Sequence, residues 1–202
     1  QVSVTPLGLD AVRFRPAEQR HEGRPYVLCV AGSDPTKNVG VLIEAFAALP
    51  GDVRDRFDLV LAGDVCKREE IRAAIARTGL SGQVKLVGLL SDAELVTSYQ
   101  QATVFVFPSL YEGFGLPVLE AMGCGCPVIC SNASSLPEVA GEAAVLVDPR
   151  RTDQLAHELA RVLASTEVQL SLRARALARS KEFVWDRTAK QTVAVYERTV
   201  DR

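Results

Sequence analysis

The sequence lacks both a long apolar run and a strong net charge. Its 202 residues carry 23 lysines and arginines against 25 acidic residues, which gives a formal charge of −2. This balance gives no electrostatic reason to bind nucleic acid or an anionic membrane. No apolar run approaches the roughly 20 residues that span a bilayer, and no signal-peptide pattern is present. We therefore expect a soluble, cytoplasmic protein with no transmembrane segment and no nucleic-acid partner.

The cysteines do not suit a disulfide framework. The chain has five, an odd number, and several lie inside apolar segments such as residues 26–30. Buried free thiols in a reducing compartment explain this placement. Cys124, Cys126 and Cys130 have no second ligand pair and no nearby histidine in the sequence, so we do not expect a metal site.

The remaining pattern is typical of repeated βα units. With 48 % hydrophobic residues, the chain can bury the core of one domain. Short apolar runs alternate with longer helical patterns, which predicts an α/β fold with a doubly wound, six-stranded parallel sheet. The expected strands are 26–31, 57–62, 84–87, 103–107, 127–130 and 144–147. The expected helices are 39–48, 67–77, 92–101, 116–122, 137–139 and 152–164.

Two helix starts carry capping chemistry. Ser91 precedes Glu94 by three residues, which predicts a capping box. Ser134 or Ser135, followed by Pro137, predicts a second start.

The fold predicts where a ligand binds. In a doubly wound sheet the site lies beyond the carboxyl ends of strands one and four, where the strand order reverses. The segments 32–38 and 109–115 should therefore line one crevice. No G-x-G-x-x-G follows the first strand, so an NAD-dependent oxidoreductase is disfavoured.

The segment 112–120 is the most informative part of the second loop. Its glycine-containing turn opens a helix, and unpaired amides at a helix N-terminus suit a phosphate. Gly113, Leu116 and Glu120 are spaced to share one helix face. Glu120 could then accept hydrogen bonds from two vicinal hydroxyls of a ribose, although an isolated glutamate is more often an ordinary surface residue.

These motifs carry a family resemblance. The segment 112–120 reads E-G-F-G-L-P-V-L-E, with an E-x7-E spacing, and is followed by A-M-G-C-G-C-P-V and L-P-E-V. Together with Gly32, Lys37-Asn38 and the segment 185–196, they resemble the C-terminal, donor-binding half of a retaining glycosyltransferase of the GT-B fold, family 4 type. The resemblance covers nearly the whole chain.

The resemblance implies a role for each matching residue. Glu112 would contact hydroxyls of the donor sugar, Glu120 would hold the ribose, and the base would meet backbone near Leu89. Glu112 and Lys37 are the expected catalytic residues. The expected residues for binding the nucleotide sugar are Gly32, Lys37, Leu89, Gly113, Phe114, Gly115, Leu116 and Glu120. For Phe114 we favour a structural role in shaping the turn.

Lys37 and the helix end could together offset the charge of a leaving diphosphate. Because the sequence contains no Asp-x-Asp triplet, we expect no metal and no cofactor beyond the UDP- or GDP-linked donor. Members of the family commonly place an arginine beside the lysine, whereas Ser33 and Thr36 stand here. Either another arginine reaches the diphosphate, or donor binding is weaker than usual.

The resemblance also divides the chain. Residues 1–24 match a linker from an N-terminal domain that is missing here, 25–183 the donor-binding domain, and 184–202 an amphipathic crossover helix. The missing domain would bind the sugar or lipid-linked acceptor and could contact the inner membrane. We therefore expect the isolated chain to bind donor but to turn over poorly.

Two other functions stay open. One is a non-catalytic nucleotide-binding module, which the missing arginine favours. The other is a GT-B epimerase or phosphorylase. Base, sugar, acceptor, linkage and oligomeric state leave no side-chain signature in the sequence.

Overall fold

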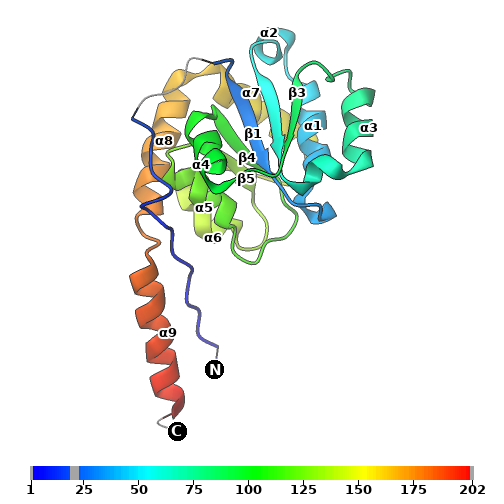
Figure 1. Ribbon diagram of the computed structural model, residues 1–202. Coiled ribbons are helices and arrows are strands. Elements are labelled where there is room, and N and C mark those ends of the chain that lie inside the picture. The colour runs from blue at the N-terminus through cyan, green and yellow to red at the C-terminus, as the bar shows by residue number, and fades with distance from the viewer. Residues whose placement is uncertain (1, 19–22, 201–202) are drawn as a thin grey trace.

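The computed structural model describes residues 2–18 and 23–200 and contains the expected six-stranded parallel sheet (Figure 1). Its strand order is β3-β2-β1-β4-β5-β6, so the order reverses between β1 and β4. The strands are β1 (Tyr26–Val30), β2 (Asp58–Ala62), β3 (Val84–Gly88), β4 (Val104–Phe107), β5 (Val128–Ser131) and β6 (Val145–Val147). Every strand end lies within one residue of the position predicted from the apolar runs.

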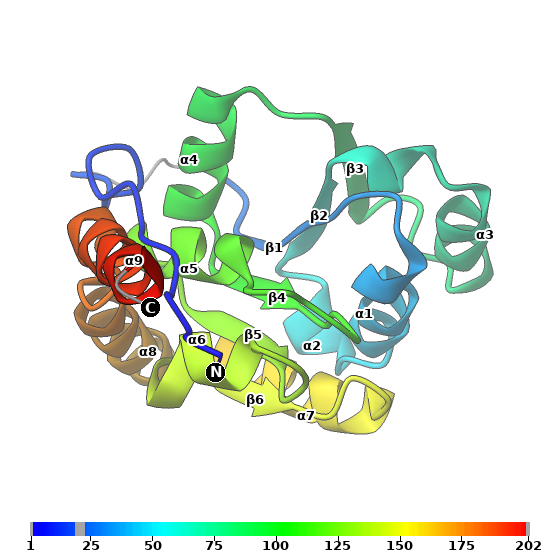
Figure 2. The same cartoon turned by 90° about the horizontal axis from the view of Figure 1, so that it is seen from below.

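Helices cover both faces of the sheet (Figure 2). The core on one face joins the sheet to α1 (Val39–Ala47), α3 (Glu69–Arg77) and α7 (Thr152–Ala164). The core on the other face joins it to α4 (Asp92–Gln101), α5 (Leu116–Gly123) and α6 (Leu136–Ala140). Strands β4 and β5 are buried along their whole length, because both of their faces are covered.

Two helices were not expected from the sequence. The first, α2 (Gly51–Arg54), is a single turn. The second, α8 (Thr166–Ser180), is long, but only Leu172, Ala176 and Ser180 are buried along it, so its apolar pattern is weak. In addition, the expected helix 67–77 is divided into a 3-10 turn, η2 (Asp64–Lys67), and α3. Two further 3-10 turns are η1 (Pro35–Lys37) and η3 (Gly141–Ala143).

The last helix, α9 (Trp185–Val200), extends away from the body beside the N-terminal segment (Figure 1). The two are joined near their bases, where the Leu9 amide donates to the Phe183 carbonyl at 2.9 Å. Trp185, Val193 and Tyr196 are each about half exposed or more. An amphipathic helix was expected here and is confirmed; its assignment as a crossover helix stays a prediction. None of the helices in the described ranges is long and apolar enough to cross a membrane.

The cysteines are free and buried, as expected. Burial raises the pKa of Cys29, Cys124 and Cys130 to about 12, so these thiols stay protonated at neutral pH. Among residues 2–18 and 23–200, no group of three or more His, Cys, Asp or Glu side chains is placed to hold a metal ion.

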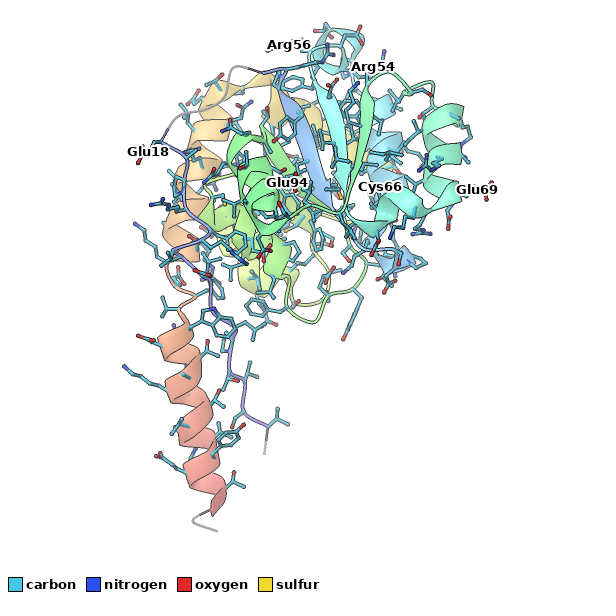
Figure 3. All side chains as sticks on the ribbon, viewed as in Figure 1. Glu18, Arg54, Arg56, Cys66, Glu69 and Glu94 are labelled. Carbon is cyan, nitrogen blue, oxygen red and sulfur yellow. The ribbon has the colours of Figure 1, made fainter. Side chains whose placement is uncertain are left out.

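The capping box at α4 is confirmed. Ser91 Oγ accepts from the Glu94 amide, and the Ser91 amide donates to Glu94 Oε2 at 2.8 Å; Figure 3 shows Glu94 on α4. Ser91→Ala should lower the free energy of unfolding by about 1 kcal/mol, because it leaves an amide of the first turn without a partner. Urea unfolding should detect this loss, while Ser81→Ala, at an exposed serine, should change little. Equal stability of the two variants would contradict the prediction.

Candidate functional site

The two predicted loops meet at the lower edge of the sheet in Figure 1. The Leu110 amide donates to the Thr36 carbonyl at 2.7 Å, which ties the loop after β4 to the loop after β1. Asn38, in the left-handed conformation with φ 56°, donates through Nδ2 to the carbonyls of Pro108 and Pro149 at 3.1 and 2.7 Å. Three chain segments are thus fastened together at the switch point, so the two loops lie beside each other as expected. That they line one ligand-binding crevice stays a prediction.

Lys37 and Glu112 form an ion pair inside this junction. Lys37 Nζ lies 2.7 Å from Glu112 Oε1, and the side chains are 23 % and 11 % exposed. The ammonium also lies 5.6 Å from the centre of the Phe107 ring, within range of a cation–π interaction. From the sequence, the two residues were expected to contact different parts of a ligand, but here they pair with each other. A partly buried pair of this kind fixes both side chains.

The turn that contains Gly113 is held by two serines that precede α6. The Glu112 amide donates to Ser134 Oγ at 2.9 Å, and Ser135 Oγ donates to the Phe114 carbonyl at 2.9 Å. The start of α6 after Ser135 was predicted correctly, but the Ser135 side chain makes no capping hydrogen bond. Its hydroxyl is used to hold the neighbouring loop.

One prediction about this turn is wrong. Gly113, Leu116 and Glu120 were expected on one helix face, but α5 begins only at Leu116. Gly115 takes the left-handed conformation with φ 105° and turns the chain into the helix. Gly113 therefore lies outside the helix and does not share its periodicity.

The first turn of α5 presents backbone donors. Pro117 has no N–H, and the amides of Val118 and Leu119 both donate to the Gly115 carbonyl. Within the described part of the chain, the amides of Gly115 and Leu116 have no such acceptor. Two unpaired donors at the positive end of a helix can bind an anion.

Glu120 lies on α5, on the side that faces α4. Its Oε2 accepts a hydrogen bond from the hydroxyl of Tyr99 at 3.1 Å. Burial raises the pKa of Glu120, while the hydrogen bond from Tyr99 and the charge of Arg13 act against that rise. The carboxylate is partly exposed and can still accept hydrogen bonds from outside.

The other predicted residues lie after β1, after β3 and in the turn that leads into α5. Gly32 follows β1, and a side chain added there would meet no atom within 4 Å. Leu89 follows β3 and is 69 % exposed. Leu116 is exposed at the start of α5, and the Phe114 ring packs edge-to-face on Phe183 with centroids 6.0 Å apart.

Sequence reasoning missed four polar residues that build the site. Asn38 was noted only as part of a motif, and Tyr99 was not singled out. Ser109 and Ser131 form a buried hydrogen bond in which Ser131 Oγ donates to the Ser109 carbonyl. The sequence does carry a signal for the serines, because Ser109 comes two residues after the apolar strand β4 and Ser131 ends the otherwise apolar strand β5.

A cleft of about 720 Å³ borders the site. It is lined by the N-terminal segment, α6, the end of α8 and the start of α9, and it includes Gly113 and Phe114. Lys37, Glu112 and Glu120 do not line it. The Lys37–Glu112 pair and Glu120 thus lie outside this cleft. The glycine turn that follows Glu112 reaches the cleft through Gly113 and Phe114.

The strand order and the helices on both faces of the sheet define the Rossmann-like type of α/β domain that forms half of a GT-B fold. Residues 11–179 match the family described as glycosyl transferases group 1. The chain belongs to that family.

Relatives with curated names are transferases. The chain is 37 % identical over 173 residues to O-antigen chain mannosyltransferase B of Escherichia coli, covering 85 % of this chain and 45 % of that protein. It is 39 % identical over 207 residues to the MMP alpha-(1->4)-mannosyltransferase of Mycolicibacterium hassiacum, covering 100 % of this chain and 49 % of that protein. The chain therefore spans about half the length of these relatives.

Solved structures support the same fold. Sucrose-phosphate synthase from Thermosynechococcus elongatus superposes with a TM-score of 0.88 at 29 % identity, over 100 % of this chain and 53 % of that one. The C-terminal domain of a glycosyl transferase group 1 protein from Francisella tularensis superposes with a TM-score of 0.74 at 25 % identity, over 87 % of this chain and 97 % of that one.

Gly115 offers a test of the turn. A Cβ at this position would lie 2.5 Å from Leu136 Cδ2, and φ is 105°. Gly115→Ala should therefore lower the free energy of unfolding by roughly 1–3 kcal/mol. Gly113→Ala is the matched control, because its Cβ would meet nothing within 4 Å. Chemical unfolding of both variants measures the difference, and a Gly113→Ala variant as unstable as Gly115→Ala would argue against this account of the turn.

Proposed function

We propose that the chain is the donor-binding domain of a retaining, metal-independent glycosyltransferase of the family 4 type. Its ligand would be a hexose linked to UDP or GDP. The observation that carries the proposal is the Lys37–Glu112 pair, which lies at the switch point where the start of α5 presents two unpaired amides. Membership of the glycosyl transferases group 1 family gives the reaction class.

In this proposal each group meets one part of the donor. The diphosphate binds the amides of Gly115 and Leu116 and receives the ammonium of Lys37, while Gly32 leaves room for it. Glu112, released from Lys37, accepts hydrogen bonds from the sugar. Glu120 accepts them from the ribose, and backbone beside Leu89 meets the base.

The proposed reaction breaks the bond between the anomeric carbon and the diphosphate oxygen. The acceptor hydroxyl forms the new bond on the same face of the sugar, and its proton passes to the departing diphosphate. Lys37 and the helix end offset the charge that develops on this leaving group, so the chain's own groups can take the place of a metal. Glu112 orients the sugar during the transfer.

The acceptor is assigned to a domain outside this chain. Because the chain spans about half of its named relatives, we propose that an N-terminal domain, joined through residues 1–24 and contacted by α9, binds a sugar or lipid-linked acceptor. The isolated chain then binds donor without efficient transfer. Its five buried free thiols fit a cytoplasmic setting.

The proposal is tested by thermal shift with UDP, GDP, ADP and their sugar conjugates, with and without EDTA. At a hundredfold excess over the dissociation constant, binding adds about 2.7 kcal/mol and should raise the melting temperature by roughly 5–10 °C. We expect a rise with UDP or GDP that EDTA does not change. A rise that EDTA abolishes would contradict metal independence, and no rise with any nucleotide would contradict the proposal.

Substitution of the two glutamates should separate their roles. Glu120→Ala should weaken nucleoside diphosphate binding about tenfold or more, because a charged acceptor for two ribose hydroxyls is lost. Glu112→Ala should leave that affinity at least as high as in the wild type, because Lys37 loses its partner and is free for the diphosphate. The same Glu112→Ala variant should discriminate less well among sugar conjugates.

Isothermal titration calorimetry of both variants measures this division. Glu69→Ala is the control, since Glu69 lies at the start of α3 and points away from the body (Figure 3). Equal losses of nucleotide and sugar-nucleotide affinity in the two site variants would falsify the assignment of separate roles.

A further inference from the structure

Tyr99 is the buried neighbour of the proposed ribose-binding carboxylate. Resting on the proposed function, we infer that Tyr99 is a positioning residue, whose hydroxyl holds Glu120 in the orientation that accepts the hydroxyls of the nucleotide ribose. The role is indirect, because Tyr99 is 0 % exposed and cannot itself reach a ligand.

The Tyr99 ring has no freedom to turn away from Glu120. It packs edge-to-face on Phe105 with centroids 5.2 Å apart and on Phe14 with centroids 6.3 Å apart. These rings come from three segments, namely α4, β4 and the N-terminal segment. The hydroxyl is therefore aimed by packing, and it donates to Glu120 Oε2 at 3.1 Å.

A fixed donor on one carboxylate oxygen changes what the other oxygen can do. A glutamate side chain has three rotatable bonds, and without a partner it would lose this freedom only on binding ligand. The contact with Tyr99 restricts the carboxylate in advance and leaves Oε1 free of this donor. Preorganisation of this kind raises affinity without adding any contact to the ligand.

Charges around Glu120 add a second consequence. Arg13 of the N-terminal segment pairs with Asp92 at the start of α4. The charge of Arg13 lowers the pKa of Glu120, and that of Asp92 raises it; Cys124, at the end of α5, is protonated and uncharged at neutral pH. Burial raises the pKa of Glu120 most strongly, and the Tyr99 hydrogen bond is the largest influence that lowers it. Tyr99 therefore also helps to keep the carboxylate ionised.

Tyr99→Phe removes the hydroxyl and keeps the ring in its packing site. Tyr26→Phe is the matched control, because it makes the same chemical change on β1, where the Tyr26 hydroxyl donates to the Ser98 carbonyl of α4 at 2.9 Å. Each variant thus loses one phenol hydroxyl at α4: Tyr26 contacts this helix from β1, and Tyr99 is part of it. Only Tyr99→Phe loses the contact with Glu120.

Calorimetric titration with UDP, GDP and their 2′,3′-dideoxy analogues supplies the first readout. Tyr99→Phe should bind the preferred nucleoside diphosphate about fivefold more weakly than the wild type, the effect of one hydrogen bond. Its affinity for the dideoxy analogue should be unchanged, because that analogue offers Glu120 no hydroxyl. Tyr26→Phe should bind both ligands as the wild type does.

The pH dependence of binding supplies a readout that a purely structural role would not move. Ribose binding needs the ionised carboxylate, so affinity should fall as pH decreases through the pKa of Glu120. Loss of the Tyr99 hydrogen bond raises that pKa, so the fall in Tyr99→Phe should begin at higher pH than in the wild type. Titrations repeated from neutral pH downwards follow this fall in both proteins.

The outcomes separate the two proposals. If the wild-type chain binds neither UDP nor GDP, the proposed function fails and this inference fails with it. If the wild type binds but Tyr99→Phe binds equally well, only the positioning role is overturned. An equal loss for the nucleotide and its dideoxy analogue, with no change in the pH profile, also overturns it, because that result indicates a general structural defect.

Discussion

The parallel pairing of β1 with β4 is the constraint on which the rest of the site depends. Val27 and Leu28 lie beside Val104 and Phe105 in register, so the chain leaves both strands at the same edge and in neighbouring positions. Residues that are 75 positions apart, Lys37 and Glu112, can then form a direct ion pair. The hydrogen bonds of Asn38 and Leu110 fasten this arrangement, and the glycine turn adds an open helix start to it.

Much of this architecture could be predicted from the sequence, because strands that are buried on both faces form continuous apolar runs. Strand ends were placed within one residue, and the switch point followed from their order. The helix α8 could not be predicted in the same way, since it buries only three residues along 15 and leaves little periodic signal. The short α2 leaves still less.

The sequence predicted which loops of the site lie beside each other, but not which of their side chains touch. The topology placed Lys37 and Glu112 on one crevice, but no pattern in the sequence indicates that their charged atoms touch. Gly113 was assigned to a helix face because spacing alone does not show where a helix begins; the left-handed Gly115 decides that point. The contact between Tyr99 and Glu120 joins two helices, and it depends on aromatic packing that only the tertiary structure defines.

Under the proposed function, the Lys37–Glu112 pair would also have a consequence for the end of a catalytic cycle. Each partner satisfies the other when no ligand is present, so the resting site has no isolated buried charge to stabilise. If a diphosphate binds Lys37 in place of Glu112, the re-formed pair would then compete with the diphosphate for the same ammonium. Such an internal competitor would weaken the hold on a spent nucleotide once the sugar has left, and would thereby favour product release over inhibition by product.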